Sequence, residues 1–257
     1  MYALILKMGL SKAYVKVNWV FLRLVLLQIG LPLEVVDWIM GCVYLACFVV
    51  LIIGSPTSFF RGLRQGCPLS PLLFFLVIEG LRKLILNAKR EGKILGVKIS
   101  ISQFISHILF VDDVLLFGNG TFEEWKEFSQ IINVFWDATR IEASSEKSIF
   151  LRNGVVDEVF DPILNKFPFK TYILDKGLKY LEYRLKPNNY LTKDWIWLIN
   201  KVEGRINNWC FRWLSLGGRL TLVKSVLISI PIYWFSLAKN LVVTINCIRS
   251  KSEFFMV

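Results

Sequence analysis

The stretch FVDDVLLFG, residues 110–118, places two adjacent aspartates, Asp112 and Asp113, between two apolar runs. Residues 104–110 and 114–117 are apolar and β-prone, which predicts a hairpin with the acids at or beside its turn. Burying a carboxylate without compensation costs far more than leaving it in water, so the pair needs an explanation. Two explanations are open: a Mg²⁺ site, because this ion prefers oxygen ligands, or an ordinary turn, because aspartate favours turns.

The segments around this hairpin alternate between strand and helix patterns. Strands are expected at residues 2–8, 47–53 and 94–101, and helices at 16–29, 33–44, 70–90 and 121–139. Ser70 is the expected N-cap of its helix, and Gly92 is expected to stop that helix. Thr121 and Glu124 have the spacing of a capping box. This order of elements predicts an α+β fold in which helices cover a sheet.

The C-terminal part of the chain has a different character. Residues 152–178, with Pro162 and Pro168 as breaks, are expected to form a connector. Further on, one helical stripe is expected to bury Trp195, Leu198, Ile199, Val202, Ile206, Trp209 and Trp213. A turn at 216–218 leads to a second helix, which Pro231 is expected to end. This pattern predicts a separate helical subdomain.

The composition is that of a basic chain with enough apolar residues to fold. Its 257 residues suffice to bury a sizeable core, and the hydrophobic content of 54% argues against disorder. It has 31 lysines and arginines against 20 acidic residues, a formal charge of +11. This excess favours an acidic partner and leaves nucleic acid and an anionic membrane surface both open.

The cysteines and the histidine restrict the kinds of site that this chain can form. The five cysteines are an odd number without a C-x-x-C pair, so reduced, mostly buried thiols in an intracellular protein are expected. The single histidine, His107, excludes a histidine-rich zinc site and disfavours a Ser-His-Asp triad. The N-terminal apolar run is too short for a signal peptide.

One uncharged stretch, from Trp38 to Phe60, raises the question of a membrane segment. Within it about 16 apolar residues precede GSPTS, whereas a membrane-spanning helix needs about 20. A buried helix end followed by a strand is the favoured interpretation. Membrane association through residues 38–53 is the alternative.

With Asp112 and Asp113 in view, the sequence resembles a known family. FVDD is similar to the metal-binding box of reverse transcriptases, in the form found in non-LTR (LINE-type) retrotransposons. RGLRQGCPLSPLLF, residues 61–74, resembles the family's R-Q-G-D-P-L-S-P motif, with Cys67 where aspartate is usual. ATRIEASSEKS, residues 138–148, resembles G-(L/M)-x-x-N-x-x-K-S, in which Arg140 and Ser144 replace glycine and asparagine.

Two further segments follow in the family's order. KYLEYRL, residues 179–185, resembles Y-L-G-x-x-L, with Glu182 in place of glycine. Residues 206–234 resemble the segment that comes next in these elements. Each motif alone is weak, but their order over nearly the whole chain makes the set highly specific.

The resemblance implies roles for individual residues. Asp112, with Asp113 beside it, is implied to be the main metal ligand of the catalytic hairpin, and the metal is Mg²⁺ or Mn²⁺. Lys147 would approach the triphosphate, where a cation offsets charge on the leaving pyrophosphate. The residues implied to lie near the template base and the incoming nucleotide are Arg64, Gln65 and Gly66. Tyr14 would screen the sugar of the nucleotide. As alternatives, Arg64 and Lys147 are surface cations and Tyr14 is a core aromatic residue.

The first motif of the family shows the largest departure. KMGLSKAYVKVNW, residues 7–19, has Gly9 in place of the metal-binding aspartate and Val15 in place of the second aspartate. Both metals of the family need the first of these carboxylates as a bridge. Asp112 and Asp113 share one hairpin and cannot surround two ions from that side alone. The sequence therefore predicts an inactive copy of an RNA-templated DNA polymerase.

The implied architecture has three parts. Residues 1–151 would form a reverse-transcriptase palm, an antiparallel sheet covered by helices. Residues 152–178 would connect it to a helical, thumb-like region over 179–257, and the fingers that precede the palm are expected to be missing. An RNA or DNA template-primer is the implied partner. The alternatives are a non-catalytic, basic nucleic-acid-binding remnant and the membrane-associated protein.

Overall fold

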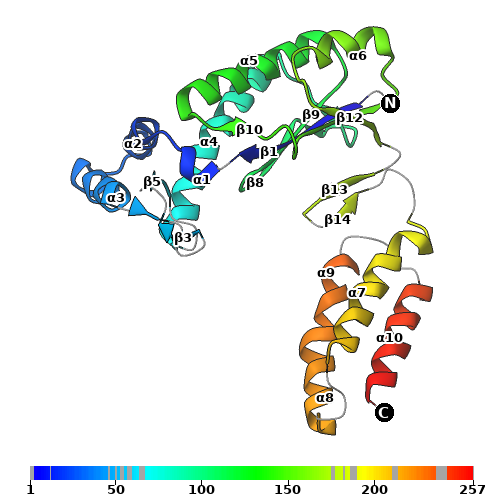
Figure 1. Ribbon diagram of the computed structural model, residues 1–257. Coiled ribbons are helices and arrows are strands. Elements are labelled where there is room, and N and C mark those ends of the chain that lie inside the picture. The colour runs from blue at the N-terminus through cyan, green and yellow to red at the C-terminus, as the bar shows by residue number, and fades with distance from the viewer. Residues whose placement is uncertain are drawn as a thin grey trace. The chain divides into compact units, whose positions relative to one another are not determined.

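The computed structural model describes residues 3–256 apart from 12, 46, 50, 53–54, 57–59, 64–66, 175–176, 182, 186–189, 210–213 and 236–241. It divides into two compact units, Met1–Ile173 and Leu174–Val257. Figure 1 shows helices packed on a sheet in the first unit, and a hairpin followed by helices in the second.

The first unit is built on a mixed sheet with the strand order β12-β11-β1-β9-β8, and β10 also pairs with β1. The strands are β1 (Ala3–Ser11), β8 (His107–Phe110), β9 (Asp113–Gly118), β10 (Glu142–Ala143), β11 (Ile149–Asn153) and β12 (Lys170–Ile173). The pair β11–β12 is parallel and the other pairs are antiparallel. The expectation of a purely antiparallel sheet is wrong at this edge, because α6 (Asp157–Leu164) supplies the crossover that a parallel pair requires.

Two of the expected strands are replaced by shorter ones. Residues 47–53 and 94–101 contribute only parts of three two-stranded sheets, β2–β5, β3–β4 and β6–β7. Their bounds are β2 (Cys47–Phe48), β3 (Leu51–Ile52), β4 (Ser55–Pro56), β5 (Phe60–Arg61), β6 (Val97–Lys98) and β7 (Phe104–Ile105). Among the described residues no helix is long and apolar enough to cross a membrane.

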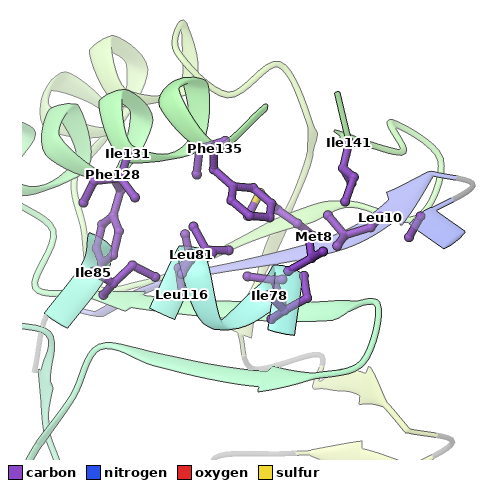
Figure 2. Close-up of a cluster of buried hydrophobic side chains, with 14 of the residues drawn as sticks. Met8, Leu10, Ile78, Leu81, Ile85, Leu116, Phe128, Ile131, Phe135 and Ile141 are labelled. Atoms are coloured by element: carbon purple, nitrogen blue, oxygen red, sulfur yellow. The ribbon is translucent and has the colours of Figure 1, made fainter. Parts of the chain in front are cut away.

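Four helices of the first unit confirm the predicted periodicity: α2 (Trp19–Gln28), α3 (Leu33–Leu45), α4 (Leu69–Arg90) and α5 (Phe122–Thr139). The short α1 (Ala13–Lys16) and α6 were not predicted. Alternation along β1 turns Leu4, Leu6, Met8 and Leu10 to one face, where all four are buried. Figure 2 shows side chains of α4 and α5 gathered with those of β1 and β9 in this core.

One expected N-cap and one expected capping box are wrong. Ser70 lies buried inside α4, and the N-cap is Pro68, which makes no side-chain capping bond. Thr121 is the N-cap of α5 but makes no capping bond to the helix. Glu124 bonds instead to backbone N–H groups outside α5, because a carboxylate is a strong acceptor for buried donors that lack a partner.

The four described cysteines are not buried, contrary to expectation. Cys42 and Cys47 are exposed, Cys67 and Cys247 are partly exposed, and all four are reduced. The exposed pair lies on and just after α3, whose buried side chains are on its other face: Val36, Met40 and Val43.

Arg140 ends α5 in a left-handed conformation, with φ at +62°. This is the position at which the motif usually has glycine, and a Cβ is disfavoured there. Replacing Arg140 with glycine should raise the free energy of unfolding by about 1 kcal/mol, because relief of this strain exceeds the entropy added to the unfolded chain.

The measurement is urea denaturation of the variant and the wild type. Lys126→Gly, on an exposed site inside α5, is the matched control and should lower the free energy of unfolding by about 1 kcal/mol. A loss of stability in Arg140→Gly as large as that of the control would contradict the strain.

The second unit begins with a hairpin of β13 (Leu178–Tyr180) and β14 (Tyr183–Leu185). Its helices are η2 (Thr192–Trp195), α7 (Ile196–Asn207), α8 (Leu216–Leu222), the π-helical turn η4 (Val223–Leu227), α9 (Ser229–Phe235) and α10 (Val242–Met256). The predicted stripe supplies its core, with Trp195, Leu198, Val202 and Ile206 buried. Trp213 of that stripe is outside the described residues.

Three boundaries differ from expectation. Residues 216–218, expected to form a turn, are the first residues of α8. Pro231 does not end a helix but lies in the first turn of α9, where the missing N–H of proline is tolerated. Residues 152–173, most of the expected connector, hold the end of β11, α6 and β12 and belong to the first unit.

Candidate active site

The two aspartates lie at the tip of the β8–β9 hairpin, as the sequence predicts. Phe110 pairs with Asp113, so Val111 and Asp112 form a two-residue turn. Val111 has φ at +53°, which this kind of hairpin turn requires but which a β-branched residue rarely adopts. The turn is tied to β1 by a hydrogen bond from Leu10 N to Asp112 O, 3.0 Å long.

Gly9 lies directly opposite Asp113 in the β1–β9 pair. Because side chains alternate along a strand, Lys7, Gly9 and Asp113 share the face of the sheet that is turned away from the buried Met8. The sheet thus brings the residue that replaces the motif aspartate next to the acidic pair.

The loop between β10 and β11 is bonded to Gly9 from both of its ends. Ser144 N donates to Gly9 O over 2.8 Å, and Gly9 N donates to the Oγ atom of the buried Ser148 over 3.3 Å. Ser148 N also donates to Ser144 O over 2.9 Å, which closes the loop as a turn. Lys147 is carried on this turn.

Lys147 fills the space beside Gly9. A Cβ atom added to Gly9 would lie 2.7 Å from Lys147 Cβ and 3.4 Å from Lys147 Cδ. The structure therefore brings Asp112, Asp113 and Lys147 into one neighbourhood, and it puts the lysine stem where a side chain at position 9 would begin.

Tyr14 lies on α1 and is packed on one side. Its ring stacks on Phe74 with centroids 4.7 Å apart, and its carbonyl accepts a 2.8 Å hydrogen bond from Leu63 N. Burial raises the pKa of Tyr14, and the charge of Asp112 raises it further. Tyr14 is thus both a core aromatic residue and a neighbour of the acidic pair. Arg64, Gln65 and Gly66 lie outside the described residues.

The electrostatics of Asp113 reflect its position between strands. Burial raises the pKa of this carboxyl, the neighbouring Asp112 raises it too, and Lys7 and Lys147 oppose the shift. Ionised Asp113 therefore costs stability, because the unfolded chain, with its lower pKa, holds the charge more easily.

Replacing Asp113 with asparagine should raise the free energy of unfolding at pH 7. The folded-state pKa lies above the unfolded value of 3.8, so the advantage of the variant is fully present above the folded-state pKa. It should shrink as the pH falls and be lost below about 3.8. Urea denaturation of both proteins at pH 7 and pH 3.5 measures this difference. A gap that widens toward acid would contradict the direction of the shift.

The acidic pair fits a two-metal centre poorly. Mg²⁺ requires near-octahedral oxygen coordination, and two ions need protein ligands on more than one side. Over the part of the chain that the structure describes, no cluster of three or more His, Cys, Asp or Glu side chains could hold an ion. At Gly9 the backbone oxygen is already bonded to Ser144 N.

The sequence singled out Asp112, Asp113, Lys147 and Gly9 but missed Lys7. Lys7 is two residues before Gly9 on a strand that the sequence did predict, so alternation alone could have placed it on the same face.

Comparison with known proteins identifies the class of this fold. Residues 1–204 match the sequence profile of the family described as reverse transcriptase (RNA-dependent DNA polymerase). The chain belongs to the reverse transcriptase family. Members of this family use a divalent metal and a nucleic-acid template.

The matches to individual proteins are shorter or weaker than the match to the family profile. An uncharacterized mitochondrial protein of Arabidopsis thaliana is 50% identical over 54 residues, which are 21% of this chain and 44% of that protein. Telomerases of Candida albicans and Candida tropicalis, each solved with a telomeric RNA fragment, align with TM-scores of 0.45 and 0.46 at 11% identity. These alignments cover 100% and 98% of this chain and 43% and 38% of the telomerase chains. The matches therefore span less than half the length of each of these proteins.

Proposed function

We propose that this chain derives from the reverse transcriptase of a non-LTR, LINE-type retrotransposon and no longer polymerises DNA. The first unit corresponds to a palm and the second to a thumb. The observation that carries the proposal is the pairing of Gly9 with Asp113, where the bridging carboxylate of a two-metal site belongs. Asp112 and Asp113 remain from the metal site, and Lys147 remains from the nucleotide site.

Primer extension on an RNA template, with Mg²⁺ and with Mn²⁺, tests the loss of activity. The expected result is no product above that of the Asp112→Asn/Asp113→Asn variant, which controls for a contaminating polymerase. Extension by the wild type that disappears in this variant would overturn the proposal.

We further propose that the chain keeps the ability to bind nucleic acid, through its second unit. The charge is unevenly divided between the units. Residues 174–257 carry 13 lysines and arginines against 5 acidic residues, a formal charge of +8, whereas residues 1–173 carry 18 against 15, a charge of +3. A basic excess concentrated in one unit is the footprint of a phosphate-binding surface.

Within that unit, α7 and the turn before it present a basic stripe. Lys193, Trp197, Lys201 and Arg205 follow one another at four-residue spacing, which aligns them on one side of the helix. The three cations are exposed, and the buried side chains Leu198, Val202 and Ile206 form a separate stripe, about 100° away around the helix.

The tryptophan of the stripe is fixed but accessible. Trp197 packs edge-on against Trp234, with ring centroids 4.8 Å apart, and is 37% exposed. An immobilised aromatic ring between cations is suited to binding a single-stranded nucleic acid, because bases stack on the ring while phosphates bind the cations.

Removing Lys201 and Arg205 should weaken binding and reduce its salt dependence. In Lys201→Ala/Arg205→Ala the negative slope of log K against log salt should become shallower by about 1.4, because each lost cation removes about one phosphate contact and each contact with a single strand contributes about 0.7. Fluorescence anisotropy of a labelled single-stranded oligonucleotide over a salt series measures the slope.

The matched control removes two exposed lysines of the first unit, Lys83→Ala/Lys126→Ala, with the same loss of net charge. Its slope should stay near that of the wild type. Equal changes in both variants would indicate an effect of net charge, and would contradict an interface on α7.

A further inference from the structure

The proposed function gives Lys147, beside the acidic pair, an origin but no present role. In the motif it belongs to the nucleotide site. In the structure its stem lies against Gly9, with Lys147 Cβ only 2.7 Å from the place of a Cβ at position 9. This contact exists only because position 9 has no side chain.

The backbone that carries Lys147 is held at both ends. Ser144 bonds to Gly9 O, and Ser148 bonds to Gly9 N and to Ser144 O. A Cβ atom follows its backbone without any rotamer freedom, so Lys147 Cβ cannot move away unless this turn moves. The side chain of an aspartate restored at position 9 would therefore clash with this turn, because no open space lies beside it.

Two lysines act on the aspartate at this place. Lys7 lies diagonally across from Asp113 on the same face of the β1–β9 pair, within the range of a long side chain. The charge of Lys147, which lies on the turn beside Gly9, favours the ionised form of Asp113. The formal charges of Asp112, Asp113, Lys7 and Lys147 sum to zero.

We infer that Lys147, together with Lys7, serves as the internal counter-ion of the aspartate pair and excludes divalent cations from it. The inference rests on the proposed loss of polymerase activity and gives it a second cause beyond the missing carboxylate. A divalent ion would have to shed water for two carboxylates alone and would be repelled by two ammonium groups.

Mn²⁺ binding to the full chain tests the inference, with free Mn²⁺ measured by electron paramagnetic resonance at low salt. Lys147→Met keeps much of the stem but removes the charge, and Lys147 is exposed, so the variant should fold. The wild type should bind Mn²⁺ with millimolar affinity or weaker. Lys147→Met should bind about tenfold more tightly, because one repulsive charge near the ion is gone.

Two controls define the site. Adding Asp113→Asn to Lys147→Met should abolish the gain. Lys170→Met removes an exposed lysine from β12, which β11 and β1 separate from β9, and should leave Mn²⁺ affinity unchanged. Three results would each overturn the inference. They are an unchanged affinity in Lys147→Met, an equal gain in Lys170→Met, and a wild-type dissociation constant far below about 1 mM that depends on Asp113, about tenfold or more below the expected range.

The steric part has its own comparison. Lys147→Gly and Lys147→Ala both remove the charge, but only Lys147→Gly also removes the Cβ atom. Gly9→Asp/Lys147→Gly should therefore bind Mn²⁺ at least tenfold more tightly than Gly9→Asp/Lys147→Ala. Tight binding by Gly9→Asp alone would contradict the filled space. If Gly9→Asp does not fold, Lys147→Met still decides the question. Primer extension by the wild type would instead overturn the proposed function, whatever these titrations give.

Discussion

Replacing Trp125 with alanine should lower the free energy of unfolding of the first unit by about 3–5 kcal/mol. Trp125, on α5, is fully buried and packs against the rings of Phe128, Phe150 and Phe167, with centroids 4.8–5.8 Å away. It also lies so close to Gly118 that a Cβ there would approach its Nε1 atom to 2.6 Å. Truncation leaves a large cavity where α5 meets β9 and β11.

Urea denaturation measures the loss, and Trp38→Ala is the matched control. Trp38 lies on α3 and is 71% exposed, so its removal should change stability by less than about 0.5 kcal/mol. A loss below about 1 kcal/mol in Trp125→Ala would contradict a core organised around this ring.

Replacing Glu124 with alanine should cost about 3 kcal/mol, although glutamate on a helix is usually a surface residue. Its buried carboxylate accepts three backbone hydrogen bonds, from Leu95 N at 2.8 Å, Gly96 N at 2.7 Å and Asn119 N at 2.6 Å. These bonds fasten the loop before β6 and the end of β9 to α5. Removal leaves three N–H donors without this acceptor, and that of Gly96 is buried.

The same denaturation assay separates this role from the loss of a charge. Glu123→Ala is the control, because Glu123 is adjacent on α5 and its side chain is 80% exposed. It should be nearly neutral. Glu124→Gln should lose about half as much stability as Glu124→Ala, since the amide keeps one acceptor oxygen but turns a donor toward one N–H. Equal effects at positions 123 and 124 would contradict the three-bond arrangement.

Local patterns predicted the elements that hold the site. Apolar, β-prone runs identified β1 and the hairpin of β8 and β9, and helical periodicity identified α4 and α5, because these signals need only neighbouring residues. The parallel pair β11–β12 and two of the three acceptor bonds of Glu124, those from Leu95 N and Gly96 N, were missed because they join segments that are distant in sequence.

The candidate site divides in the same way. The position of Asp112 and Asp113 at a turn follows from their own sequence, and the importance of Gly9 follows from the family motif. The contact of Lys147 with Gly9 could not be predicted, because it depends on the turn that Ser144 and Ser148 fix against β1.

The most direct test of the central claim is a crystal of the chain soaked with Mn²⁺ and measured at a wavelength where manganese scatters anomalously. The account predicts no anomalous peak at Asp112 and Asp113, with the stem of Lys147 lying against Gly9. A pair of peaks about 4 Å apart between this hairpin and β1, in the arrangement of a two-metal polymerase, would contradict it.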